Sequence, residues 1–521
     1  MKKEKPIFVN QIGFKPKAPK SAFISESIVK DDLVFYIVNF DDKVVYKNTL
    51  QKPKEDRLVG EKIYEANFSD FTEEGVYRIL CNNVKSYSFK INYNCYDDLL
   101  FSVYNFFKIS RCGEEIKEGD FARPACHTAS ALIYGTNEHK AVKGGWHDAG
   151  DYGRYIVNAA KAVMDMLLSY NEYKAKFSQF NLLKEIQFEL EWMLQMQRED
   201  GAVYHKISCY HFCGFINPQD EKDEIVISPI STTATADFAG TLAYASLIFK
   251  EKDEKFAEKL LEASVKAQNY LDNHVDELYK NPPAITTGEY GDDNATDERY
   301  FALCSLFVAT EESDYLLKAK ELKKSVKDYI GWGNFGGYGT EILLKNKDLV
   351  DDKDFISTLQ TEIISLADEI VSVAENSPVA YSEKRVYWGC NGGICDNSHI
   401  LFIANSIEKK DIYLEIAQKQ LSYLLGCNPI SICYVTGNGE YCSEHTHHRP
   451  SVATGKEMKG MLSGGPTEFL IDDILKKTYS EKNVPPLKRF LDDERSYSSN
   501  EIAINWNSGI GYLITEIAYW C

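Results

Sequence analysis

The spacing of apolar residues changes once along this chain, near residue 94, and the change divides it into two regions of different architecture. From residue 6 to about residue 92, short runs rich in Val, Ile, Phe and Tyr alternate with breaks that carry proline, glycine or aspartate. About seven strands at such spacing are typical of an all-β sandwich of immunoglobulin type. We therefore predict an immunoglobulin-like β-sandwich over residues 1–93.

Beyond residue 94, apolar residues recur at spacings of three and four, which predicts α-helices. About eleven helices are expected, many of them separated by loops that carry Gly, Trp, His and Asp. Helix pairs with polar residues on the connecting loops build either an open solenoid or a closed barrel. Because the sequence has no repeat of fixed period, we predict a closed all-α barrel over residues 94–521.

The net charge and the cysteine content limit the kinds of partner and the compartment that suit this protein. The net charge is −19 and no basic run is present, which argues against nucleic acid or an anionic membrane as partner. No apolar run follows Lys2, Lys3 and Lys5, so we expect neither a signal peptide nor a transmembrane segment. The 13 cysteines are then expected to be thiols or metal ligands. These features favour the cytoplasm, and a chain trimmed of its signal would be secreted instead.

The glycine-rich segment at residues 144–155, GGWHDAGDYGRY, carries two carboxylates, Asp148 and Asp151. Its four glycines allow tight turns and a close approach to a ligand, so we predict a loop followed by a helix. Aromatic faces beside carboxylates suit a sugar, and we expect Trp146 and Tyr152 to contact substrate. The alternative is a solvated Asp-Gly turn.

A second candidate carboxylate, Glu501, lies near the other end of the chain. It follows Ser498, Ser499 and Asn500, which are typical of a helix N-terminus with a capping side chain. Glu501 alone would then stabilise the helix dipole by roughly 0.3–1 kcal/mol. Trp506, which lies between two asparagines, forms another sugar-compatible cluster with them.

Histidines gather shortly before this segment, at residues 445–449, in a chain that has only 10 of them. One interpretation is a zinc site, and a metal-dependent hydrolase would then be the function. The other is that His447 and Arg449 hydrogen-bond a substrate, which fits better if Asp151 and Glu501 are a catalytic pair.

Eight segments in the same order resemble glycoside hydrolase family 9, the cellulase family with an immunoglobulin-like N-terminal module. They are VNQIGF at 9–14, GGWHDAGDYGRY, DGAVYHK at 200–206, YLLGCNP at 423–429, SICYVTGNGE at 431–440, HHRPS at 447–451, GGP at 464–466 and YSSNEIAINWN at 497–507. The resemblance covers almost the whole chain. It implies an (α/α)6 barrel and inverting hydrolysis of β-1,4-linked glucans or related sugars.

The resemblance also implies roles for individual residues. Asp151 would be the general base, Asp148 would help to hold the attacking water, and Glu501 would be the general acid. His447 and Arg449 would bind the sugar in the −1 subsite, with Trp506 nearby. An inverting enzyme needs these two carboxyl groups, because one protonates the leaving oxygen and the other activates water on the opposite face of the sugar.

Two metal sites are expected, and no organic cofactor. Cys112, Cys126, His127 and His147 offer four ligands suited to structural zinc, which the resemblance supports, and buried free thiols are the alternative. Because His147 adjoins Asp148, this zinc would anchor the catalytic loop. Asp293, Asp297 and Glu298 offer carboxylates for calcium, and an acidic first turn of a helix is the alternative.

Several alternatives stay open. The enzyme is either an endo-acting cellulase or an exo-acting enzyme on cellodextrins or chitosan oligosaccharides, so glucose, glucosamine and N-acetylglucosamine are all candidate sugars. A noncatalytic carbohydrate-binding protein is the alternative outside enzymes. The sequence departs from the family pattern at Thr467, after Gly-Gly-Pro, and at Cys427, before Asn-Pro. Both lie in loops expected to shape the cleft. The oligomeric state is not predicted.

Overall fold

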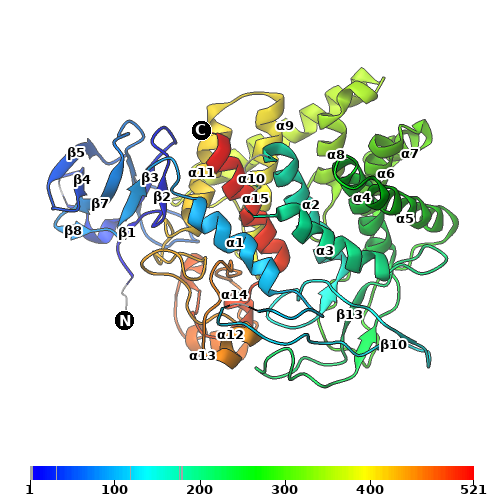
Figure 1. Cartoon of the computed structure of the whole chain (residues 1–521). Coiled ribbons are helices and arrows are strands. Elements are labelled where there is room, and N and C mark those ends of the chain that lie inside the picture. Colours follow the sequence, from blue (N-terminus) through cyan, green and yellow to red (C-terminus); the bar gives the residue numbers. More distant parts are fainter. Residues whose placement is uncertain (1–3, 31, 118, 175–176, 178–179, 521) are drawn as a thin grey trace. The chain divides into compact units, whose positions relative to one another are not determined.

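The computed structural model describes residues 4–30, 32–117, 119–174, 177 and 180–520 (Figure 1). The chain divides into two compact units. One combines Met1–Phe106 with Ala367–Cys521, and the other is Phe107–Leu366. The predicted boundary at residue 93 lies inside the first unit, so the β-sandwich and the last helices of the chain belong to one compact body.

The N-terminal region is a sandwich of two sheets, as predicted. One sheet has the strand order β2 (Gly13–Phe14), β9 (Phe89–Ile91), β7 (Gly75–Cys81), β4 (Val34–Asn39) and β5 (Val44–Thr49), and β8 (Val84–Lys85) pairs with β7. The other has the order β1 (Ile7–Phe8), β3 (Ser21–Ser25) and β6 (Ile63–Asn67). Alternate residues such as Phe35 and Ile37 are fully buried in the core between the sheets, which is the period expected of strands with one covered face.

The helices of the first unit follow the sandwich and return at the end of the chain. α10 (Cys390–Ile407) packs against α11 (Asp411–Leu424) and α15 (Ile504–Trp520). Shorter helices are α12 (Arg449–Thr454), α13 (Asp473–Tyr479) and α14 (Tyr497–Asn500). Two helices continue from one unit into the other, namely α1 (Asp97–Ile109) and α9 (Lys353–Asn376).

The second unit is built around α4 (Thr232–Phe249), which is buried along nearly its whole length and packs against α2, α5 and α6. The helices are α2 (Ile156–Tyr173), α3 (Leu182–Gln195), α5 (Glu254–Asn273), α6 (Thr296–Thr310), α7 (Ser313–Lys323) and α8 (Gly336–Lys345). A small sheet has the order β11 (His139–Lys140), β10 (Ala131–Ile133), β14 (Ile225–Ile227), β13 (Lys206–Cys209) and β12 (Arg154–Tyr155). Single 3-10 turns occur at Glu26–Ile28, Lys347–Leu349 and Pro486–Lys488.

Two helices, α8 and α7, depart from what the spacing of their residues predicts. α8 begins with glycines, which disfavour helices, but packing requires them: a Cβ on Gly339 would lie 2.8 Å from the Tyr300 ring. α7 ends at Lys323 although the apolar spacing continues to residue 330. Lys323 Nζ pairs with Asp328 Oδ2 at 3.1 Å and with Glu362 Oε2 at 2.6 Å, and these ion pairs lie at the end of the helix.

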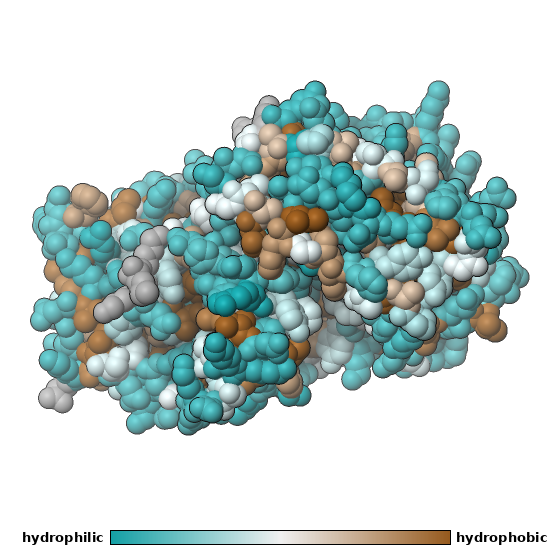
Figure 2. Space-filling model, turned by 90° about the horizontal axis from the view of Figure 1, so that it is seen from below, coloured by the Kyte–Doolittle hydropathy of each residue, from teal (hydrophilic) through white to brown (hydrophobic). Residues whose placement is uncertain are grey.

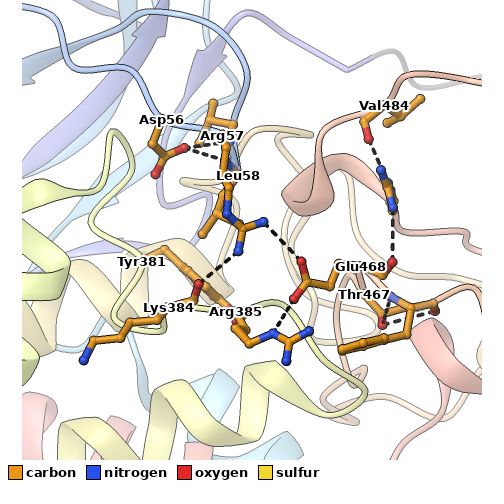
Figure 3. Close-up of polar contacts among 12 residues, drawn as sticks. Asp56, Arg57, Leu58, Tyr381, Lys384, Arg385, Thr467, Glu468 and Val484 are labelled. Atoms are coloured by element: carbon orange, nitrogen blue, oxygen red, sulfur yellow. Dashed lines mark hydrogen bonds and ion pairs between the residues drawn. The ribbon is translucent and has the colours of Figure 1, made fainter.

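The sandwich is joined to the helical part of its own unit by polar contacts. Figure 3 shows Arg57, on a sandwich loop, and Arg385 both reaching Glu468, with N–O distances of 3.1 and 2.7 Å. Thr467 is fully buried beside this carboxylate, and its hydroxyl accepts from Phe469 N at 3.1 Å. The departure from the family pattern at Thr467 therefore shapes the backbone of the Gly-Gly-Pro loop.

Hydrophobic residues on the face seen in Figure 2 form small separate patches among hydrophilic ones. None of the described helices combines the length and the apolar character needed to cross a membrane.

Candidate active site

The loop at residues 144–155 folds back on itself and ends at α2, as predicted. Asp148 N donates to Gly153 O at 2.9 Å, which closes a tight turn around Asp151. Gly153 is required there, because a Cβ would lie 2.8 Å from Asp151 Oδ2. This oxygen accepts from Gly153 N at 3.1 Å and from the Tyr155 hydroxyl at 3.2 Å. Asp151 is thus held by its own loop and is only 6% exposed.

Asp148 has no exposed surface and differs sharply from Asp151 in its surroundings. Asn158 Nδ2 donates to Oδ1 at 2.7 Å, and the Tyr290 hydroxyl donates to Oδ2 at 2.8 Å. Burial, together with the nearby charge of Asp151, nevertheless raises the pKa of Asp148 to about 8. Asp148 is therefore protonated near neutral pH, and a second negative charge beside Asp151 is avoided.

Two aromatic residues of this loop face inward. Trp146 has no exposed surface, its Nε1 donates to Glu185 at 2.8 Å, and its ring packs on Phe107. Tyr152 is 6% exposed and packs on His147 with ring centroids 4.9 Å apart. The prediction that Trp146 stacks on a sugar is corrected, because Trp146 belongs to the core. Tyr152 covers a candidate metal ligand, and its contact with a sugar stays a prediction.

Glu501 lies at the end of α14 in an extended conformation, with φ −72° and ψ 160°. The expectation that it begins a helix is wrong, because α15 starts only at Ile504. Its backbone is instead paired on two sides: it forms a parallel bridge with His447, and its carbonyl accepts from Gly464 N at 2.8 Å. The last three sequence motifs of the chain thus meet at Glu501.

The histidine-rich segment is shaped by hydrogen bonds to its backbone. Asp492 accepts from the backbone N–H groups of Glu444 and His445, and Asn500 Nδ2 donates to His445 O. His447 N donates to Asn500 O at 2.9 Å, and its Nδ1 lies 2.5 Å from Glu494 O. This places His447 beside Glu501, while Arg449 begins α12 and is 7% exposed.

Trp506 was predicted to contact the sugar, and Trp388 is a second tryptophan that the sequence analysis did not single out. A Cβ on Gly389 or on Gly392 would lie 2.6 or 2.3 Å from the Trp506 ring, so the half-buried indole is held tightly by the Trp-Gly-Cys-Asn-Gly-Gly segment. Trp388 is 42% exposed, and its ring centroid lies 5.3 Å from that of Tyr497. An exposed indole of this kind offers a flat surface for a sugar ring.

Four side chains come together as a candidate metal centre in the second unit. The ligand atoms of Cys112, Cys126, His127 and His147 all lie within 4.8 Å of one another. Cys112 Sγ is 3.7 Å from His127 Nδ1, and Cys126 Sγ is 3.7 Å from His147 Nε2. Ligand atoms around tetrahedral zinc would be about 3.6 Å apart, so the set fits this ion.

The protonation states of the cluster also suit a metal. The hydrogen bond between the two thiols lowers the pKa of Cys126 and raises that of Cys112, so the thiolate that metals bind is favoured at Cys126. Glu221 Oε2 lies 2.8 Å from His127 Nε2, so Nδ1 of that ring is left to face the cluster.

A second cluster consists of carboxylates, and it includes one residue that the sequence analysis missed. Asp237, on α4, is fully buried, and neither of its carboxylate oxygens has a hydrogen-bond partner among the described residues. Burial, with the charges of Glu298 and Asp297 on α6, raises its pKa well above the usual range. Burial likewise raises the pKa of Glu298 to about 9. Asp293, by contrast, is exposed.

Three further residues beside the glycine-rich loop carried no recognisable sequence signal. Tyr290 contacts Asp148, Lys206 lies near Asp151, and Glu221 reaches His127. Tyr290 lies 142 residues from Asp148 along the chain, and Glu221 lies 94 residues from His127. Neither has a sequence spacing that marks it as a site residue. Lys206 belongs to a segment that resembles the family, but its type alone indicates no role.

Known families match both parts of the chain. The family model for glycosyl hydrolase family 9 matches residues 96–514, and that for the cellulase N-terminal immunoglobulin-like domain matches residues 2–86. A cellodextrinase from Butyrivibrio fibrisolvens is 32% identical over 98% of this chain and 100% of its own length. A xyloglucan-specific endo-beta-1,4-glucanase from Bacteroides ovatus is 32% identical over 98% and 93%.

Solved structures agree over the whole length. A single mutant of a thermostable endoglucanase from Alicyclobacillus acidocaldarius is 29% identical and superposes with a TM-score of 0.93, covering 99% of this chain and 100% of that one. A Zn-binding triple mutant of an endoglucanase of the same family is 26% identical, with a TM-score of 0.91 over 97% and 99%. The predicted fold class, an immunoglobulin-like sandwich followed by an (α/α)6 barrel, is confirmed.

Proposed function

The chain belongs to glycosyl hydrolase family 9, and on that premise we propose that it is an inverting hydrolase of β-1,4-linked glucans. Asp151 is the general base and Glu501 the general acid. The observation that carries these roles is the contrast within the glycine-rich loop, where Asp148 is sealed off and protonated while Asp151 lies in a turn built around its carboxylate.

Each residue then has one task in the proposed reaction. Asp151 takes a proton from water as the water oxygen attacks the anomeric carbon. Glu501 gives its proton to the glycosidic oxygen as the C–O bond breaks, so the configuration inverts. His447 and Arg449 hold the sugar beside Glu501, and the exposed ring of Trp388 stacks on a neighbouring sugar.

The stereochemistry of the product tests this mechanism directly. NMR during hydrolysis of cellotetraose should show the α-anomer first, and initial release of the β-anomer would rule out inversion. Asp151→Asn and Glu501→Gln should each lower kcat roughly 10²–10⁴-fold. Asp200→Asn is the matched control, because Asp200 is a surface carboxylate paired with Arg198, and it should leave kcat unchanged.

A finer proposal is that short cellodextrins are the preferred substrate. It is supported by the match to a cellodextrinase over the full length of both chains. Equal molar amounts of cellohexaose, chitosan oligosaccharides and carboxymethylcellulose would be compared, with product sizes and viscosity recorded. Glucose release from cellodextrins with little loss of viscosity supports exo action, whereas a rapid fall in viscosity with longer products would establish an endoglucanase.

We propose zinc as the ion of the cysteine and histidine cluster. Its two thiols, two imidazoles and the outer carboxylate of Glu221 form a closed set without an open position, so the ion would have a structural role and hold the glycine-rich loop. Elemental analysis of protein purified without chelator should find about one zinc per chain. Its absence, with all four residues intact, would contradict the assignment.

We propose calcium for the carboxylates around Asp237, because a buried carboxyl group without hydrogen-bond partners needs either a bound cation or its own proton. After treatment with EGTA, added calcium should raise the Tm of the native protein by mass action. Asp237→Asn should abolish that rise. If calcium has no effect and Asp237→Asn alone stabilises the protein, the cluster is protonated instead.

We also propose that the enzyme works in the cytoplasm. Twelve cysteines are described, and none of them is joined in a disulfide, which suits a reducing compartment. Fractionation of the source cells with antibody detection would test this, and recovery of the protein from the medium would contradict it.

A further inference from the structure

Two adjacent residues, His205 and Lys206 at the start of β13, hold the loop at residues 281–290. Both side chains are fully buried. Lys206 Nζ donates to Asn281 Oδ1 at 2.8 Å and to Thr287 Oγ1 at 3.1 Å, and it also reaches the carbonyl oxygens of Thr287 and Gly288. The ammonium therefore binds both ends of this loop.

His205 holds the next residue of the same loop. Its Nε2 lies 3.0 Å from Glu289 O and its Nδ1 lies 2.9 Å from Ser231 Oγ, while its ring stacks on Tyr279 with centroids 3.8 Å apart. Burial lowers the pKa of His205 to about 3, so the ring is neutral. Nε2 then donates to the carbonyl and Nδ1 accepts from the hydroxyl.

The loop ends at Tyr290, which contacts the glycine-rich loop. Tyr290 has a φ of +50°, an unfavourable value for a residue other than glycine, and such a residue persists only where its neighbours fix it. Its hydroxyl donates to Asp148 Oδ2 at 2.8 Å, and its ring packs on Tyr155 with centroids 4.8 Å apart. Tyr155 in turn donates to Asp151. The clamp thus acts on both aspartates through two tyrosines.

The charge of Lys206 is left uncancelled by its hydrogen-bond partners, because all four of those oxygens are neutral. Two carboxylates act on it, Asp151 and Glu289. Glu289 is 41% exposed and lies 3.7 Å from Lys280, so water and a second ammonium screen it. Asp151 is 6% exposed, and the loop that carries it leads into β12, where Tyr155 pairs with Lys206.

Other groups that face Lys206 do not compete for this role. The rings of Tyr155 and Tyr279 lie 5.4 and 5.7 Å from Nζ, and their faces attract a cation. His205 is neutral, as described above. Burial lowers the pKa of Lys206 to about 7, and Asp151 opposes this shift.

We propose that Lys206 is a positioning residue of the hydrolytic site: its ammonium clamps the loop at residues 281–290 and so fixes Tyr290 and Tyr155, which hold the two aspartates. The proposal rests on Asp151 being the general base. Lys206 acts through Tyr290, Tyr155 and the carboxylate, and it exchanges no proton with the substrate.

The test compares Lys206→Met, which keeps the stem and removes the charge, with Lys206→Arg, which keeps the charge. Lys206→Met should lower kcat roughly 10- to 100-fold and change KM less than about threefold, because substrate binding is retained while the base is misplaced. Lys206→Arg keeps a donor cation for the same four oxygens and should restore part of kcat.

Lys140→Met is the matched control, since Lys140 lies over the ring of Tyr204 at 5.5 Å and bonds only Gln197 O among the described residues. It should leave kcat and the pH profile unchanged. If Lys206→Met fails to fold, Asn281→Leu keeps the ammonium but removes one of its partners, together with the bonds of Asn281 to Tyr279 and Thr287, and it should lower kcat.

The outcomes separate this inference from the proposed function. An inactive Asp151→Asn variant together with a native kcat in Lys206→Met would overturn the role of Lys206 alone. An active Asp151→Asn variant would overturn the assignment of the base, and the role of Lys206 with it. A kcat that does not recover in Lys206→Arg would also contradict the clamp.

Discussion

At the scale of single residues, the structure separates two aspartates that look alike in the sequence. They are three positions apart in one motif, yet Asp148 is sealed by Asn158 and Tyr290 while Asp151 is held in a turn by backbone and a tyrosine hydroxyl. Environment, not residue type, divides their roles, because burial penalises the ionised form of a carboxyl group.

This difference predicts a stabilising substitution. The pKa of Asp148 rises from 3.8 to about 8 on folding, so between these values the folded protein holds a proton that the unfolded protein has lost. Stability therefore falls as pH rises through this window. Asp148→Asn stays neutral, and it should raise the free energy of unfolding at pH 8 by on the order of 2 kcal/mol, with no gain near pH 4.

Urea denaturation at pH 4, 6 and 8 measures this effect. Asp165→Asn is the matched control, because Asp165 is equally buried but lies 2.6 Å from Lys161 Nζ. Removing that charge leaves a buried ammonium without its counterion, so this variant should be destabilised. A gain for Asp148→Asn that does not depend on pH would contradict the explanation.

At the scale of elements, the candidate metal centre ties the segment at residues 112–127 to the glycine-rich loop. The tie is reinforced by backbone bonds, since Cys112 N donates to Gly145 O at 2.8 Å and His147 N donates to Ser110 O at 2.9 Å. The loop has no helix or sheet of its own before Arg154, so such cross-links replace regular secondary structure in fixing Asp151.

Loss of one ligand should therefore loosen the loop without unfolding the barrel. Cys126→Ser should lose its zinc, lower the Tm by several degrees, and reduce kcat less than Asp151→Asn does. Elemental analysis, calorimetry and kinetics measure the three effects. Cys304→Ser is the control, because Cys304 is buried in α6 and is outside the cluster. Equal losses in both variants would show that the cluster has no special role.

At the scale of the whole chain, the β-sandwich is joined to the helical part of its unit through Gln11, in the motif VNQIGF. Gln11 Nε2 donates to Ser431 O and Tyr441 O at 2.9 and 3.1 Å, and its Oε1 accepts from Glu440 N and Tyr441 N at 2.9 and 2.8 Å. One side chain thus satisfies four backbone groups of the segment that precedes the histidine-rich loop.

Gln11→Ala should consequently destabilise the chain by roughly 2–4 kcal/mol, because it removes four hydrogen bonds at a buried or half-buried junction. Urea denaturation followed by tryptophan fluorescence measures the loss. All six tryptophans lie outside the sandwich, so their fluorescence reports on the helical part. Gln51→Ala changes an exposed side chain and should have no effect. A native transition in Gln11→Ala would show that the junction contributes little.

The sequence by itself determined the local elements and the family. The change from alternating to helical spacing predicted the sandwich and most helices, because these patterns state which face of an element is buried. The metal cluster was predicted from its four ligand types together with the family resemblance, with buried free thiols as the alternative. The glycines of the loop also carried their signal locally, since backbone turns are short-range.

Only the tertiary structure decided which side chains face substrate and which are buried. Trp146 and Tyr152 turn inward, and Glu501 lies in an extended segment beside His447, because contacts from distant segments override local preference. Lys206 and Asp237 acquire their roles from burial near other charges, an electrostatic effect that depends on distance in space. No pattern of neighbours along the chain encodes that distance.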